Sequence, residues 1–128
     1  MNPVVHFEMP AKDKQRMAEF YSKVFGWQTT MLGPEMGNYV LVNTAETDEN
    51  NMVRNPGMIN GGFFEKTKEP EYTRLVIAVD NIHESIKKVE AAGGILHGQP
   101  QDIPGVGLYI VFTDTEGNEQ GILQPAEM

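Results

Sequence analysis

The sequence has 128 residues, 40% of them hydrophobic, and a formal net charge of -8. This length corresponds to about one domain with a core of its own. The lack of cysteine excludes disulfides and thiolate metal sites, and the acidity argues against nucleic acid as a partner, because phosphate contacts need clustered Lys and Arg. We find neither a stretch near the ~18 apolar residues of a membrane span nor a signal peptide, so we expect a cytoplasmic protein without a membrane partner.

The chain begins with a short predicted strand, Val4 to Met9, that we expect to end at Pro10. A helix follows, with Asp13 as its N-cap and Gly26 at its left-handed C-terminal position. Its apolar residues recur with the spacing of one helix face, and they are Met17, Phe20, Tyr21, Val24 and Phe25.

Three strands are predicted after this helix, at 27–32, 38–43 and 58–65. The acidic, turn-rich segment 44–57 separates the last two and is expected to be an exposed loop.

The same pattern then starts again. A mostly apolar strand at 73–80 precedes a helix that Asn81 caps, and three strands follow at 94–99, 106–114 and 118–125. Gly93 follows Asp80 at the same separation at which Gly26 follows Asp13. The chain therefore contains an internal repeat of two βαβββ units, about 1–66 and about 70–125, within a single domain 1–128.

The residues that carry the repeat resemble a known superfamily. The segments "HFEMPAKDKQRMAEFYSKVFGW", "VD" before the second helix, "AAGG" after it, and "TDTEGN" near the end resemble the vicinal oxygen chelate superfamily over essentially the full length. That superfamily includes glyoxalase I, bleomycin-resistance proteins and extradiol dioxygenases, and the nearest likeness is to small proteins related to lactoylglutathione lyase. The resemblance implies an α+β fold in which two βαβββ modules form an open eight-stranded barrel-like cleft, and it suggests a homodimer.

The resemblance also implies a divalent metal (Zn, Ni, Mn or Fe), held by side chains of the first and last strands of each module. His6 occupies the first ligand position. Arg74 occupies the second module's first position, where a guanidinium has no lone pair to donate. Gly121 occupies the last-strand position and has no side chain. We therefore predict no metal at the usual place and no other cofactor.

The fourth strand carries Gly61 and Gly62 at the level of the expected cleft, and Glu65 at its end could donate an oxygen ligand. A metal-dependent isomerase would require Glu8 and Glu65 to replace the missing ligands. The glycine pair would either let a ligand approach the backbone closely or form a β-bulge.

His6 and Glu8 alternate on one face of the first strand. Arg74 on the matching strand of the second module is predicted to lie opposite Glu8 and to form a charge-assisted pair with it. This trio would be either a structural polar network or a binding site for a carboxylate-bearing ligand, with Arg74 as the anchor. In the second case His6 and Glu8 are the candidate catalytic acid and base.

Three strand aromatics, Tyr39, Phe63 and Tyr109, would either line an apolar ligand pocket or pack in the core. The sole tryptophan, Trp27, is expected to pack at the corner between helix and strand rather than to stack on a ligand.

Two functions are consistent with these residues. One is a glyoxalase-like lyase or isomerase that binds a small organic molecule in the cleft between its modules and works without the usual metal. The other is a non-catalytic protein of the bleomycin-resistance type that sequesters such a molecule.

Overall fold

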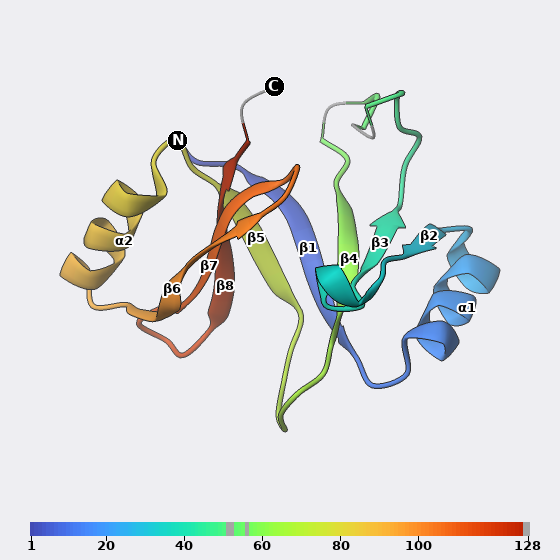
Figure 1. Ribbon diagram of the computed structural model, residues 1–128, viewed down its shortest axis with the longest axis horizontal. Coiled ribbons are helices and arrows are strands. Elements are labelled where there is room, and N and C mark those ends of the chain that lie inside the picture. The colour runs from blue at the N-terminus through green and yellow to red at the C-terminus, as the bar shows by residue number, and fades with distance from the viewer. Residues whose placement is uncertain (51–52, 56, 127–128) are drawn as a thin grey trace. The chain divides into compact units, whose positions relative to one another are not determined.

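The computed structural model describes residues 1–50, 53–55 and 57–126. The chain forms two compact units, His6–Thr73 and Met1–Val5 with Arg74–Met128 (Figure 1). These bounds are close to those of the two predicted modules. The first five residues belong with the second module because the carbonyl of Pro3 accepts a hydrogen bond from the backbone N–H of Ala78, at 2.9 Å.

The first module consists of β1 (Val4–Ala11), α1 (Lys14–Phe25), β2 (Gln28–Met31), a short 3-10 helix η1 (Pro34–Met36), β3 (Val40–Asn43) and β4 (Asn60–Glu65). Its strands lie in the order β2-β3-β4-β1. β4 runs parallel to β1 and antiparallel to β3, which in turn is antiparallel to β2. β4 therefore lies between β1, which carries His6 and Glu8, and β3, which begins directly after Tyr39.

The second module consists of β5 (Arg74–Ala78), α2 (Ile82–Ala91), β6 (Ile95–Ile103), β7 (Gly107–Thr113) and β8 (Glu119–Pro125). Its strands lie in the order β5-β8-β7-β6. The first and last strands are again parallel and the other pairs antiparallel. The two modules thus share one topology, and the predicted βαβββ repeat and α+β class are confirmed.

Both helices begin at the residues that the sequence indicates. Asp13 accepts a hydrogen bond from the N–H of Arg16 at 3.1 Å, and Asn81 accepts from the N–H groups of His83 and Glu84. These caps satisfy N–H groups that have no partner within the helix. Gly26 ends α1 with a φ of 74°, a backbone conformation that glycine adopts without a steric penalty.

Each module has its own core, formed between its helix and one face of its sheet. Val40, Val42 and Phe63 are at most 1% exposed and pack near Tyr21 and Trp27 in the first module. Ile82, Ile110 and Ile122 form the core of the second. Trp27 stacks on the Tyr21 ring with a centroid distance of 4.6 Å, so its predicted packing role is confirmed.

Two strands extend beyond their predicted ends. β1 continues through Pro10 to Ala11, whose carbonyl accepts a hydrogen bond from the N–H of Lys66. Successive residues of a parallel strand direct their hydrogen-bonding groups to opposite sides, so the N–H that Pro10 lacks would have pointed away from β4. β6 continues to Ile103 through a register shift between His97 and Gln101.

None of the helices in the described part of the chain is both long enough and apolar enough to cross a membrane.

Candidate functional site

A buried carboxylate lies on the face of β1 that points away from α1. Glu8 is 7% exposed, and among the described residues it is the one polar or charged side chain that is buried. Burial of a charge is costly unless the group is hydrogen-bonded. Buried ionisable groups with specific partners are concentrated at functional sites, so Glu8 is the first candidate.

Tyr39 joins Glu8 to His6. The Tyr39 hydroxyl donates a hydrogen bond to Oε2 of Glu8 at 2.8 Å, and the same hydroxyl lies 3.2 Å from Nε2 of His6. The prediction that His6 and Glu8 share one face of the strand is confirmed by this common partner. Tyr39, predicted only to line a pocket or the core, is the centre of a three-residue hydrogen-bonded group, hereafter the His6–Tyr39–Glu8 group.

Gly62 allows Tyr39 to reach Glu8. Residue 62 pairs with Glu8 on one side and with Leu41 on the other, so β4 separates β1 from the strand that follows Tyr39. A Cβ atom at Gly62 would collide with the phenol ring of Tyr39. The missing side chain therefore leaves room for the ring to cross β4.

Gly61 and Phe63, the residues on either side of Gly62, face the opposite side of the sheet. A Cβ atom at Gly61 would collide with the ring of Phe7, and Phe63 is 1% exposed in the core below α1. The pairing between β1 and β4 is continuous from His6 to Ala11, which excludes a bulge at the glycines. Aromatic rings of this chain occupy the spaces at Gly61 and Gly62, where the sequence suggested room for a ligand. Phe63 is a core residue and does not lie with Glu8.

Burial and charge act on His6 in opposite directions. Burial lowers the pKa of His6 below its usual value of 6.5, and the nearby charge of Glu8 partly offsets this by raising it. The larger cause is burial, so the neutral imidazole predominates near pH 7. A neutral imidazole is the form that accepts a proton.

The second module repeats the tyrosine and the glycine but not the acid. Gly121 pairs with Val76 and with Val111, and a Cβ atom at Gly121 would meet the phenol of Tyr109. Tyr109 therefore corresponds to Tyr39, Gly121 to Gly62, and Val76 to Glu8. Arg74, two residues before Val76, corresponds to His6. Its predicted pairing with Glu8 would join the two modules and stays a prediction.

The side chains present do not fit the superfamily's metal site. Arg74 offers no lone pair, and Tyr109 fills the space where a side chain of residue 121 would lie. Glu65 pairs with Ala11 and, by the alternation of β4, points to the face opposite Glu8. The alternative in which Glu8 and Glu65 together bind a metal is therefore wrong. Among the described residues, no three His, Cys, Asp or Glu side chains converge.

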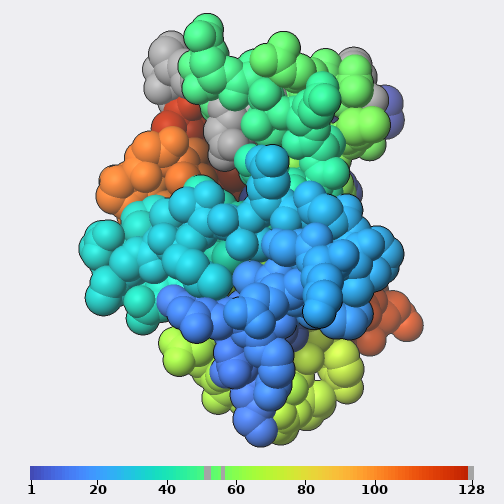
Figure 2. Space-filling view, turned by 90° about the vertical axis from the view of Figure 1, so that its right-hand side faces the viewer, coloured from blue at the N-terminus to red at the C-terminus, as the bar shows by residue number. Residues whose placement is uncertain are grey.

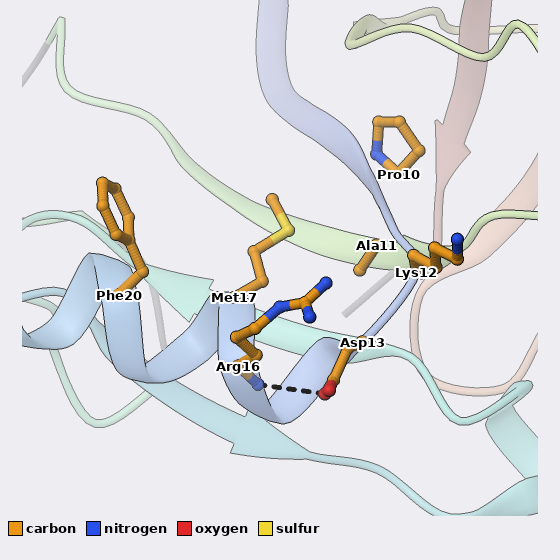
Figure 3. A pocket seen from close by; sticks show the side chains of 7 residues that line it. All are labelled: Pro10, Ala11, Lys12, Asp13, Arg16, Met17 and Phe20. Carbon is orange, nitrogen blue, oxygen red and sulfur yellow. Dashed lines mark hydrogen bonds between the residues drawn. The ribbon is translucent and has the colours of Figure 1, made fainter.

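A surface hollow lies elsewhere on the first module. It has a volume of about 360 Å³ and lies where β1 ends and α1 begins, with Lys12, Arg16, Met17 and Phe20 among its lining residues (Figure 3). Helix α1, which borders this hollow, lies at the surface in the space-filling view (Figure 2). None of the three residues of the His6–Tyr39–Glu8 group lines this hollow.

Comparison with known families gives a match over most of the chain. Residues 4–120 match the family model of the Glyoxalase/Bleomycin resistance protein/Dioxygenase superfamily. The chain belongs to this superfamily. A glyoxylase-like domain-containing protein from Didymella fabae is 31% identical over 123 residues, which are 90% of this chain and 88% of that protein.

Other relatives differ in length or in sequence. The anthracycline biosynthesis protein DnrV of Streptomyces peucetius is 26% identical over 95% of this chain. The chain spans only 48% of DnrV and 22% of a mycobacterial relative. Among solved structures, a methylmalonyl-CoA epimerase from Mycobacterium tuberculosis has a TM-score of 0.68 and 12% identity, covering 97% of this chain and 88% of that chain. At this identity the likeness concerns the fold alone.

Proposed function

We propose that this glyoxalase-like protein binds a small organic molecule and catalyses a proton transfer on it, a reaction of the isomerase type. The observation that supports the proposal is the His6–Tyr39–Glu8 group, in which a half-buried imidazole and a buried carboxylate share one hydroxyl. A simple hydrophobic binding site has no need of such a group. We also propose that the protein is a homodimer, which rests on the family resemblance alone, and that it acts in the cytoplasm, which rests on the sequence patterns described above.

In this proposal His6 is the base and Glu8 is the group that finally holds the proton. The lowered pKa of His6 keeps the imidazole neutral near pH 7, and a positioned base of this kind contributes about 10²–10⁴-fold to a rate. The proposal retains the prediction that Arg74 binds an anionic group of the ligand. No metal is assigned to the reaction, because the donor set described above does not form a ligand cage.

The substrate class that fits is a carbonyl compound with an acidic C–H bond and an anionic group. A neutral imidazole can remove such a proton because the neighbouring carbonyl delocalises the resulting charge. The epimerases that share this fold act on methylmalonyl-CoA, which makes methylmalonyl-CoA a reasonable first probe for this chain.

The test is deuterium incorporation from D2O into the acidic C–H position, followed by NMR. The probes are methylmalonyl-CoA, free methylmalonate and a set of 2-hydroxy ketones that carry a carboxylate, each also measured for binding by calorimetry. We expect one of these probes to bind and to exchange faster in the presence of the protein than in buffer. Binding with exchange at the buffer rate would contradict the proposal.

The second candidate is a non-catalytic binding protein, and one observation favours it. Tyr109 fills the space at Gly121, where the superfamily resemblance implies a metal ligand, so this part of the fold presents an aromatic ring instead of a ligand. Binding without exchange in the same experiment is the result expected for this second function.

A further inference from the structure

The hydrogen bonds of Tyr39 restrict which nitrogen of His6 carries a proton. A tyrosine hydroxyl has one hydrogen to donate, and an ionised carboxylate can only accept. Tyr39 gives its hydrogen to Oε2 of Glu8 at 2.8 Å. Its oxygen must then accept at the 3.2 Å contact with His6. The proton on the neutral imidazole is therefore on Nε2, and Nδ1 carries the lone pair.

Nothing else in the described part of the chain competes for Nδ1. The hydrogen bond of His6 runs through Nε2 to Tyr39, and the remaining electrostatic influence on the ring is the charge of Glu8. Nδ1 is thus the imidazole atom that can accept a proton from outside the group.

We propose that Tyr39 is a positioning residue that holds His6 in the Nε2–H form, makes Nδ1 the base, and relays the Nε2 proton to Glu8. This deepens the proposed function and rests on it for its catalytic part. When Nδ1 takes a proton from the substrate, the Nε2 proton moves to the oxygen of Tyr39 as the hydroxyl proton moves to Oε2 of Glu8. The substrate carbon keeps the electron pair of the broken C–H bond, and the negative charge of Glu8 is neutralised.

The relay ends with a neutral imidazole that now carries its proton on Nδ1. An imidazolium, which partial burial disfavours at this position, is therefore not left behind. Reversal of the relay delivers the proton from Nδ1 to another atom of the delocalised intermediate, which is the second half of the isomerisation. One group can thus both remove and replace a proton, as an isomerisation requires.

The hydroxyl of Tyr39 can do this only while its ring lies over Gly62. This gives two ways to remove the relay. Tyr39→Phe deletes the hydroxyl and keeps the ring, whereas Gly62→Ala keeps the hydroxyl and displaces the ring. Tyr21→Phe is the matched control, because Tyr21 lies in the same module and packs in the core on the other side of the sheet.

The test is nitrogen-15 NMR of the histidine side chains in the ligand-free protein, above the pH at which His6 titrates. We expect wild type and Tyr21→Phe to show Nε2 protonated and Nδ1 unprotonated, with an Nε2 proton that exchanges slowly with water. In Tyr39→Phe and Gly62→Ala the slowly exchanging signal should be lost, and the two nitrogens should report mixed forms of the ring.

Two results would overturn the inference. One is a wild-type spectrum with the proton on Nδ1; the other is an Nε2 signal that persists unchanged when Tyr39 loses its hydroxyl. Because these spectra need no substrate, the inference can fail while deuterium exchange still succeeds, and the reverse also holds. The two proposals are therefore tested separately.

Discussion

Replacement of His6 by alanine is expected to slow deuterium incorporation into a bound substrate by about 10²–10⁴-fold, the usual contribution of a positioned acid or base. Nδ1 of His6 has no hydrogen-bond partner in the described part of the chain, and it is the proposed proton acceptor of the His6–Tyr39–Glu8 group. Its loss removes the base, while the carboxylate and the phenol stay in place. Ligand affinity, measured by calorimetry, should change by no more than a few-fold.

His83→Ala is the control for this experiment. His83 lies exposed in the first turn of α2, in the second module, and its removal should leave the exchange rate unaltered. An undiminished rate in His6→Ala would remove His6 from catalysis.

Replacement of Phe63 by alanine is expected to lower the free energy of unfolding by about 3–5 kcal/mol, the range for a fully buried phenylalanine. Phe63 is 1% exposed, packs with Val40 and Val42, and its ring centroid lies 5.8 Å from that of Tyr21. The truncation removes apolar contacts and leaves a cavity between β4 and α1. Urea denaturation followed by tryptophan fluorescence measures the loss, since Trp27 packs against the same core.

Tyr72→Ala is the matched truncation of an exposed aromatic residue. Tyr72 is 74% exposed, so its loss should change the stability by no more than about 0.5 kcal/mol. Similar stabilities for the two variants would contradict the core role of Phe63. A stable Phe63→Ala that no longer binds ligand would show instead that Phe63 lines a binding site.

The repeat was predictable because its signals are local. Asp13 and Asn81 as N-caps, Gly26 at the end of α1, and alternating or helical apolar patterns each depend on a few neighbouring residues. The recurrence of these signals in the same order then implied the paired βαβββ topology. Pro10 was misleading because its effect depends on which side of β1 the partner strand lies, and this the sequence does not state.

The candidate site was predictable only in part, because its geometry depends on contacts across a strand. The alternation of β1 was enough to place His6 and Glu8 on one face. Tyr39 joins them only because Gly62 pairs opposite Glu8, and this register is not visible in the sequence. The glycines signalled unoccupied space within a strand. Which ring fills each space became clear only from the folded chain.

The measurement that tests the account most directly is an NMR titration of His6 in wild type and in Glu8→Gln. The signal of His6 is assigned by its disappearance in His6→Ala. Burial lowers the pKa of His6 and the charge of Glu8 raises it. The pKa of His6 is therefore expected to lie below 6.5 in wild type and to be still lower in Glu8→Gln. A wild-type pKa at or above 6.5, or a pKa that does not respond to the loss of the Glu8 charge, would contradict the claim that His6 and Glu8 form one buried proton-transferring group.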